Sequence, residues 1–242
     1  MAFHYSPKVI TDSLILCLDA GNIKSYPLSG ATWSDISKRE NIGTLTNGPT
    51  FSSSNSGVIT FDGVDDCVLL PQSTINQTVG NYSFSVWVSF LNTMTASHTS
   101  NYMLMEAQNT LLGGVDNYLY MLSNSTASGT NGRIGFQTFN PLSILYTTTN
   151  SWIGGRWYNI VCTYDISISK QSIYVNGILE NSKTIAGCYF NTNTYFTLGS
   201  YTSPPRTWFL NGRIARFDVY SKTLSDSDIL QNYNAFKGRY GL

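Results

Sequence analysis

The chain has 242 residues, of which 42% are hydrophobic and only 12% are charged, about half the charged share of a typical soluble domain. Its 14 Lys and Arg side chains balance its 14 Asp and Glu side chains, so its net charge offers no long-range attraction to nucleic acid or to an anionic membrane. No apolar run reaches the roughly 20 residues of a membrane-spanning helix, and the run at 14–18 is too short for a secretory signal. We expect no nucleic acid partner, no membrane insertion and no signal peptide.

Short runs of β-branched and aromatic residues, each closed by Gly, Asn, Ser or Pro, recur along the chain. This pattern is typical of a protein built from many short strands. The predicted strands cover residues 14–19, 58–61, 67–70, 83–90, 102–107, 118–122, 133–138, 157–164, 172–175, 195–198 and 209–220. In 83–90 and 157–164 apolar residues alternate along one face, which predicts antiparallel sheets with one buried side.

Two Asn-Gly pairs and two tryptophans refine this prediction. Asn176-Gly177 separates two apolar runs and favours a two-residue hairpin turn, because both central residues of such a turn need a positive φ. Asn211-Gly212 predicts a similar turn before the last strand. Trp87 and Trp157 lie in strong strands, where we expect them to fill the space between two packed sheets.

One helix is predicted near the C-terminus. Ser225 can cap it, and Asp228 three residues later completes a variant of the capping box. An apolar stripe follows at helical spacing, and Gly238 is expected to end the helix. We expect this helix to pack on the edge of the sandwich. The predicted fold class is thus all-β, an antiparallel two-sheet jelly-roll sandwich with one short C-terminal helix.

Four cysteines, Cys17, Cys67, Cys162 and Cys188, lie far apart and without the spacing of metal ligands. Buried reduced thiols are the expectation for a chain synthesised in a cytoplasm, and disulfides are the alternative.

Five segments, in order, resemble the laminin-G-like jelly roll of the concanavalin A-like lectin and glucanase superfamily. They are Leu16-Cys17-Leu18-Asp19-Ala20-Gly21-Asn22 with Trp33-Ser34-Asp35, then Phe61-Asp62-Gly63-Val64-Asp65-Asp66-Cys67-Val68, then Ser83-Phe84-Ser85-Val86-Trp87-Val88, then Arg156-Trp157-Tyr158-Asn159-Ile160-Val161 with Ile173-Tyr174-Val175-Asn176-Gly177, and finally residues 212–225. The resemblance covers roughly residues 13–237. It implies an N-terminal arm, 1–12, followed by a single domain, 13–242.

The two ends of the chain, residues 1–7 and 237–242, are similar to stand-alone versions of this domain encoded by tailed bacteriophages, marine and cyanobacterial ones above all. This second resemblance implies a virion component made in the host cytoplasm, such as a capsid decoration, a fibre or a tail-associated protein. Its partners would be other virion proteins or copies of itself, together with cell-surface glycans.

The acidic residues argue against catalysis. Relatives of the glucanase type carry Glu-x-Asp-x-x-Glu on one strand, and retaining hydrolysis needs two carboxyl groups about 5 Å apart. Here Glu40, Glu106 and Glu180 are isolated from one another. Neither His4 nor His98 lies in the context of a nucleophile elbow. We therefore predict that the protein is not an enzyme.

No cofactor is required by this reading, and calcium is the one metal that the sequence suggests. Relatives of the laminin-G type hold Ca²⁺ at an edge of the sandwich. Asp19, Asp62 and Asp65, helped by Asn22 and Asp66, are the candidate oxygen donors in turn-like segments. The alternative is that these side chains bond the backbone of their own turns. Ala215-Arg216 stands where relatives carry an acidic pair, which argues against a site on the last strand.

An aromatic and basic patch is the candidate ligand site. Trp152 lies in a loop-like stretch, and the Pro-rich segment 201–208 carries Tyr201, Arg206 and Trp208. Aromatic platforms beside polar side chains suit glycans, and they suit protein partners equally. The alternative for Trp208 is that it begins the last strand and is buried.

These observations predict a non-catalytic virion surface protein whose lectin-like sandwich recognises proteins or glycans. A free-standing carbohydrate-binding lectin is the alternative, and a glycan hydrolase is the third reading.

Overall fold

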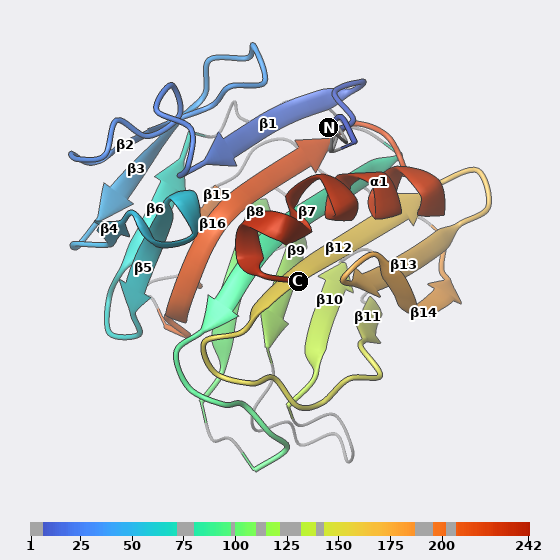
Figure 1. The fold of residues 1–242 in the computed structure, drawn as a ribbon. Helices are drawn as coiled ribbons and strands as arrows, with labels where there is room; N and C mark the ends of the chain where they lie inside the picture. The colour runs from blue at the N-terminus through green and yellow to red at the C-terminus, as the bar shows by residue number, and fades with distance from the viewer. Residues whose placement is uncertain are drawn as a thin grey trace, which may run out of the picture.

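The computed structural model describes residues 7–71, 80–97, 100–109, 115–121, 132–138, 143–186, 196–201 and 207–242, with the backbone alone for 108–109 and 115–121. Two antiparallel sheets of eight strands lie face to face (Figure 1), which confirms the predicted fold class. The strands are β1 (Leu14–Asp19), β2 (Thr32–Ser34), β3 (Ile42–Thr46), β4 (Thr50–Ser52), β5 (Val58–Asp62), β6 (Cys67–Leu70), β7 (Tyr82–Phe90), β8 (Tyr102–Asn109), β9 (Val115–Met121), β10 (Ile134–Thr138), β11 (Ser143–Tyr146), β12 (Trp157–Asp165), β13 (Lys170–Val175), β14 (Ile178–Thr184), β15 (Phe196–Leu198) and β16 (Asn211–Tyr220). The helices are α1 (Asp226–Phe236) and the short 3-10 turns η1 (Ser54–Ser56) and η3 (Lys237–Tyr240).

The first sheet, sheet A, has the order β14-β13-β12-β7-β16-β5-β4. Strand β16 pairs with β7 along one side, and on its other side it pairs first with β5 and then with β1. A register shift between Ile214 and Arg216 separates these two halves. The first and last strands of the domain are therefore neighbours. The second sheet, sheet B, has the order β11-β10-β9-β8-β15-β6-β3-β2.

The main core fills the space between the two sheets. Alternate residues of β7 and β12, such as Phe84, Val86 and Ile160, face Leu104 and Phe136 of sheet B, and all five side chains are almost fully buried. This is the alternation that the sequence shows. Each Å² of apolar surface removed from water stabilises the fold by about 25 cal/mol, so this layer is the main source of stability.

The outer face of sheet A carries a second apolar layer under the C-terminal segment. Trp87 and Trp157 are buried here, against Tyr240 of η3, and not between the sheets as predicted. Figure 1 shows α1 and the C-terminus lying across β16, β7 and β12. The helix therefore packs on a sheet face, so the expected position on the sandwich edge is wrong.

The ends of α1 agree with the sequence only at the N-terminus. Ser225 accepts a hydrogen bond from the backbone N–H of Asp228, and the Asp228 carboxylate accepts one from the backbone N–H of Ser225, which confirms the capping box. At the other end α1 passes directly into η3, and Gly241, with a φ of 71°, ends the turn. Gly238 does not end the helix.

The two predicted Asn-Gly turns differ. Asn176 and Gly177 have φ values of 53° and 80° and join β13 to β14, as predicted. Asn211 and Gly212 lie inside β16, paired with β5 and β7. Gly212 is needed for close approach, because a Cβ there would stand 2.8 Å from the carbonyl oxygen of Ser89.

Side chains of β14 tie the two sheets together along one open edge. The Glu180 carboxylate accepts hydrogen bonds from the backbone N–H groups and hydroxyls of Thr148 and Thr149. Burial alone would raise the pKa of Glu180, but these bonds outweigh burial and lower it. Asn181 and Lys183 also donate to carbonyl oxygens of β11. Side chains of β14 thereby bond the backbone of β11 in the opposite sheet.

The cysteines in the described part of the chain are buried thiols. Cys17, Cys67 and Cys162 form no disulfide, as expected, and Cys188 lies outside the described residues. The described part of the N-terminal arm lies against α1, where Asn232 accepts a hydrogen bond from the backbone N–H of Ile10. No helix in the described residues is both long and apolar enough to span a membrane.

Candidate functional site

A hollow of about 510 Å³ opens where both sheets end, at the start of β8 and of β16. The turn between β5 and β6 forms one side of it through Gly63, and Trp208 with Phe209 forms another. Asn101 and Asn211 add amide groups to its lining. The volume falls within the range of small-molecule sites. Three chain segments that are remote in sequence thus meet at one candidate binding site.

Trp208 is the most unusual residue of this site. It is 39% exposed, which agrees with the predicted patch and contradicts the alternative that Trp208 begins the last strand and is buried. Its φ is 58°, in the left-handed region that costs a residue other than glycine about 1–3 kcal/mol. The backbone carbonyl of Trp208 accepts a hydrogen bond of 2.8 Å from the N–H of Met103, which holds this conformation. A strained backbone that presents a large aromatic ring is typical of a functional position.

Tyr201 stands beside Trp208. The two rings lie 5.4 Å apart between centroids, at an angle of 43°, within the range of favourable aromatic pairs. Tyr201 also pairs with Thr207 through a β-bridge. Arg206, the other residue of the predicted patch, lies outside the described residues.

Trp152 does not belong to this site. Its indole is fully buried, it donates a 2.8 Å hydrogen bond to the carbonyl oxygen of Gly132, and it packs against Phe90 and Tyr158. A ring without exposed surface offers no platform to a ligand, so Trp152 is removed from the predicted patch. The sequence shows that Trp152 has polar neighbours, but it does not show the β-bridge that joins Trp152 to the buried Met94.

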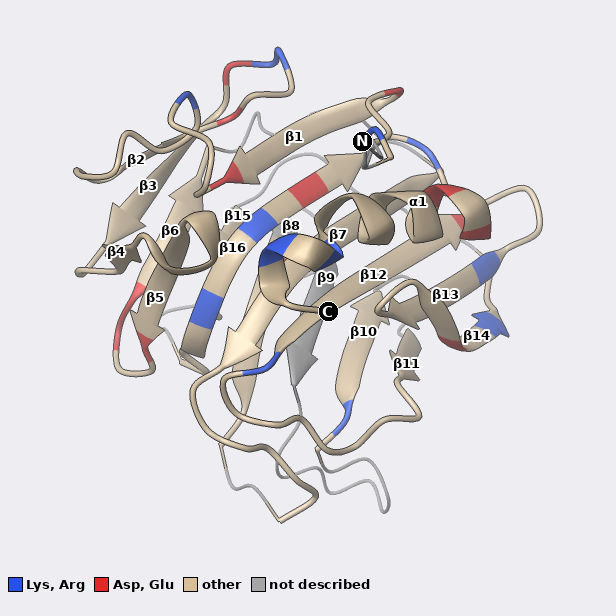
Figure 2. Cartoon of the chain, in the orientation of Figure 1, with Lys and Arg blue, Asp and Glu red and all other residues tan. Residues whose placement is uncertain are grey.

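Acidic residues gather on the turn between β5 and β6 (red in Figure 2), and this turn borders the hollow through Gly63. Carboxylate oxygens of Asp62, Asp65 and Asp66 all lie within 4.8 Å of one another. Asp62 accepts hydrogen bonds from the backbone N–H groups of Val64 and Asp65, and Asp66 accepts one from the N–H of Asp62. Burial raises the pKa of Asp66, and the negative charges of Asp62 and Asp65 raise it further.

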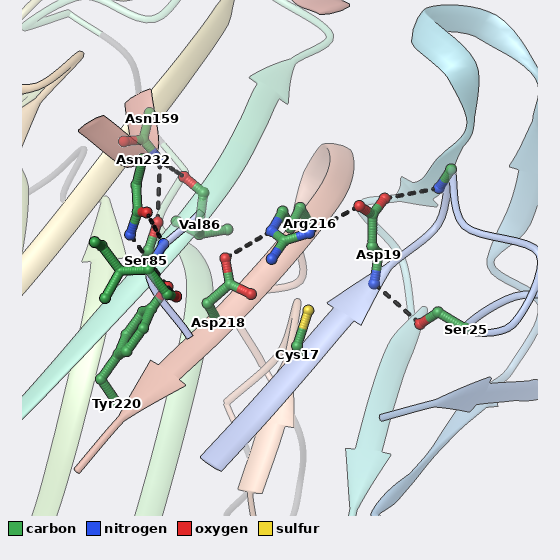
Figure 3. Close-up of polar contacts among 12 residues, drawn as sticks. Cys17, Asp19, Ser25, Ser85, Val86, Asn159, Arg216, Asp218, Tyr220 and Asn232 are labelled. Carbon is green, nitrogen blue, oxygen red and sulfur yellow. Dashed lines mark hydrogen bonds and ion pairs between the residues drawn. The ribbon is translucent and has the colours of Figure 1, made fainter. Parts of the chain in front are cut away.

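Asp19 lies elsewhere, in a buried charge cluster on the outer face of sheet A (Figure 3). The Arg216 guanidinium bonds Asp218 at 2.7 Å and Asp19 at 2.9 Å, and Arg239 bonds the other oxygen of Asp19 at 2.7 Å. Burial would raise the pKa of Asp19, but the two guanidinium groups outweigh burial and lower it. Asp19 is thus committed to ion pairs and is not available to the acidic turn.

The aromatic ring of Phe236 also covers Arg216. The guanidinium of Arg216 lies 4.3 Å from the centre of the Phe236 ring, in the geometry of a cation–π contact. Arg239 donates further hydrogen bonds to the carbonyl oxygens of Asn55 and Gly57. A Cβ on Gly21 would stand 2.4 Å from Arg239, so this position must be glycine for the arginine to reach Asp19.

Neither group of carboxylates has the arrangement of a glycosidase pair. Asp19 and Asp218 converge, but two arginines and the C-terminal segment close them off from solvent. Asp62, Asp65 and Asp66 come from one turn, so they cannot flank a scissile bond from two sides. Glu106, one of the three isolated glutamates, is fully buried in β8.

Comparisons with known proteins identify the family and the fold. Residues 62–230 match a family described as the concanavalin A-like lectin/glucanases superfamily. The binding domain of botulinum neurotoxin DC in complex with rat synaptotagmin II has a TM-score of 0.70 at 15% identity, over 94% of this chain and 52% of that chain. The serotype D binding domain has a TM-score of 0.67 at 17% identity, over 93% and 51%.

The binding domain of botulinum neurotoxin DC in complex with SialylT is similar to the same degree, with a TM-score of 0.68 at 16% identity over 93% of this chain and 52% of that one. The chain therefore spans about half the length of these solved structures, and at such identities the likeness concerns the fold alone. No curated protein matches the sequence.

Proposed function

This chain belongs to the concanavalin A-like lectin/glucanases superfamily, and we propose that it is a non-catalytic recognition domain on the surface of a virion. The observation that carries the recognition role is Trp208, which is exposed beside Tyr201 at the mouth of the hollow and has a strained backbone. An aromatic pair at the edge of a hollow with amide groups provides a stacking face and hydrogen bonds together. Among the described residues, the two groups of carboxylates are either closed off by arginines or confined to one turn, which supports a non-catalytic role.

The virion role rests on the sequence. The two ends of the chain are similar to stand-alone phage versions of the domain, and the surface carries few charges. A weakly charged surface is less prone to aggregation when an assembly covers part of it. Other virion proteins or further copies of the chain are the proposed partners. The similar toxin domains were solved with a protein and with a glycan, which supports both kinds of ligand for the exposed site.

Two experiments test this function. We expect electron microscopy of native particles to place the protein on their surface, and a glycan array to reveal a ligand that Trp208→Ala loses. Removing an aromatic anchor at a binding site costs about 2 kcal/mol or more, roughly thirty-fold in Kd. Ile178→Ala is the control, because Ile178 is 70% exposed on β14, at a distance from the hollow. Binding that survives Trp208→Ala would contradict the site, and a protein absent from particles would contradict the virion role.

We also propose that Asp62, Asp65 and Asp66 hold a structural calcium ion. Three neighbouring carboxylates supply part of the six to eight oxygen ligands that Ca²⁺ takes, and backbone carbonyls and water complete such shells. A cation would relieve the mutual repulsion that raises the pKa of Asp66. Asp19, which the sequence grouped with these donors, takes no part in this proposal because its carboxylate is paired with two arginines.

Chelation is expected to lower the melting temperature. If calcium is present at about a hundredfold excess over its Kd, removing it costs about 2.7 kcal/mol. Metal analysis of protein purified without chelator should give calcium in stoichiometric amount. Asp65→Asn should abolish both the bound calcium and the fall in melting temperature on chelation. Asp12→Asn is the matched control, since Asp12 is exposed and pairs with Lys222 far from the turn. Metal-free protein with an unchanged melting temperature would end the proposal.

A further inference from the structure

The turn between β3 and β4 combines exposure with a reactive pair of residues. Asn47-Gly48 forms this turn at the left edge of Figure 1, and both residues are exposed. Their φ values of 68° and 115° lie in the region that Asn and Gly tolerate best. An asparagine followed by glycine can lose its side-chain amide without an enzyme, because glycine has no side chain that hinders attack by its backbone nitrogen. Asn47-Gly48 is therefore a candidate site of covalent modification.

The reaction exchanges one carbon–nitrogen bond for another within the chain. The backbone nitrogen of Gly48 attacks the side-chain carbonyl carbon of Asn47, and a bond forms between these two atoms. The bond from that carbon to Nδ2 breaks, and the amide group leaves as ammonia together with the proton from the Gly48 nitrogen. Water then opens the succinimide ring and leaves aspartate or isoaspartate at position 47. Water is the only co-reactant, and the chain gains one negative charge.

Little in the fold restrains the two reacting groups. Among the described residues, none accepts a hydrogen bond from the backbone N–H of Gly48. The Asn47 side chain is held by one exposed hydrogen bond, in which Nδ2 donates to the carbonyl oxygen of Asp65 at 2.9 Å. Water competes for an exposed hydrogen bond, so its net contribution is small. The side chain can therefore leave Asp65 and turn onto Gly48 while the strands stay folded.

The two other Asn-Gly pairs that the structure describes are held more firmly. The side-chain oxygen of Asn176 accepts a 2.9 Å hydrogen bond from the backbone N–H of Asn159, and the backbone N–H of Asn176 donates to the carbonyl of Asn159. Asn211 and Gly212 lie inside β16, in register with β5 on one side, and Gly212 is also in register with β7 on the other. The reaction at either pair requires ladder or turn hydrogen bonds to break first.

The modification would fall beside the acidic turn between β5 and β6. A Cβ on Gly48 would stand 3.8 Å from a carboxylate oxygen of Asp66, and the Asn47 side chain reaches the carbonyl of Asp65. A carboxylate at position 47 has no N–H to donate to that carbonyl. Its charge also adds to the three carboxylates of the turn, whose oxygens already lie within 4.8 Å of one another. Like charges at such distances repel, so the two turns would separate.

From these contacts we propose that Asn47 is a site of spontaneous deamidation, and that of the described Asn-Gly pairs it alone is free to react in the folded protein. The product releases the β3–β4 turn from the β5–β6 turn. Because the β5–β6 turn borders the Trp208 hollow through Gly63, the modification would alter one side of the candidate binding site. The deamidation itself requires neither the proposed ligand nor the proposed calcium ion.

Peptide mapping by mass spectrometry, after incubation of the full-length protein in mildly alkaline buffer, tests the proposal. Breaking one or two further hydrogen bonds slows a reaction by about tenfold, so Asn47 should deamidate about tenfold faster than Asn176 and Asn211. The chain unfolded in urea is the control, because the three pairs should then react at similar rates. Equal rates in the folded protein would overturn the proposal, and so would an Asn47 that reacts only in urea.

Asn47→Asp tests the effect of the product on the acidic turn. With a chelator present, so that calcium plays no part, we expect this variant to melt about 2–4 °C below the native chain, because it loses the bond to Asp65 and adds repulsion. High salt should narrow the difference, since it screens charges at the surface. A variant that melts at or above the native temperature would show that the modification does not loosen the two turns.

Discussion

Arg216→Met is expected to destabilise the protein by about 3–5 kcal/mol, because it leaves buried carboxylates without their counter-charge. Asp218 is 4% exposed, and its closest cation is the guanidinium of Arg216 at 2.7 Å. Asp19 would keep only Arg239. Urea unfolding followed by tryptophan fluorescence measures the change, and the double variant Arg216→Met with Asp218→Leu should recover a large part of it, since no uncompensated charge then remains at position 218.

The control for this prediction is an exposed ion pair of similar length. Lys222 bonds Asp12 at 3.0 Å, but the Asp12 side chain is 78% exposed. Such pairs contribute about 0–1 kcal/mol, so Lys222→Met should be close to neutral. Equal effects of Lys222→Met and Arg216→Met would mean that the buried cluster is not important for stability.

Tyr240→Ala is expected to cost about 3–5 kcal/mol, the range for removing a large aromatic side chain from a packed site. The Tyr240 ring stacks on Trp87 at 4.2 Å and contacts Trp157 at 4.8 Å, so its loss would open both indoles to water. Thermal unfolding, together with binding of a hydrophobic dye to the newly exposed indoles, measures the effect.

Tyr240→Phe separates packing from hydrogen bonding. The Tyr240 hydroxyl is buried and has no hydrogen-bond partner in the described residues, and burial raises its pKa. Removing an unsatisfied buried hydroxyl is neutral or stabilising. We therefore expect Tyr240→Phe to melt at the same temperature as the native chain or higher. A loss close to that of Tyr240→Ala would show that the hydroxyl has an important partner.

The sequence predicts the fold well where side chains alternate. Strands β1 and β6 begin and end at the predicted residues, and β7 and β12 differ by a single residue at one end. Strands β2, β3, β4 and β11 were not predicted, and of β14 only the turn before it was, for two physical reasons. Most are only three to five residues long, and β14 is an edge strand whose polar side chains bond the opposite sheet and show no apolar alternation.

The outward side of sheet A could not be predicted from periodicity. Alternation separates two faces of a strand, but it does not say that a helix covers the second one. Trp87 and Trp157 are buried as expected, but against η3. For the same reason the sequence suggested Asp19 as a metal ligand, because nothing local shows that Arg216 and Arg239 meet it from distant positions.

The candidate site was predicted in part. Trp208 and Tyr201 lie together as expected of one patch, and Asp62 and Asp65 share one turn. Trp152 was misplaced because its polar neighbours suggested exposure. Contacts across the strands of sheet A are invisible in the sequence, since Ser83, Thr163, Ser172 and Ser182 become neighbours only through the register of four strands.

The charge cluster has a consequence for biosynthesis. During synthesis the Asp19 carboxylate has no counter-charge until Arg216, 197 positions later, and Arg239, 220 positions later, have been added to the chain. Strand β1 likewise has no ladder partner until β16 leaves the ribosome. Such distant pairings slow folding and leave unpaired strands exposed meanwhile. The nascent chain therefore stays open until β16 and Arg239 have been synthesised, and its yield in cells should depend on chaperones that shield it during that interval.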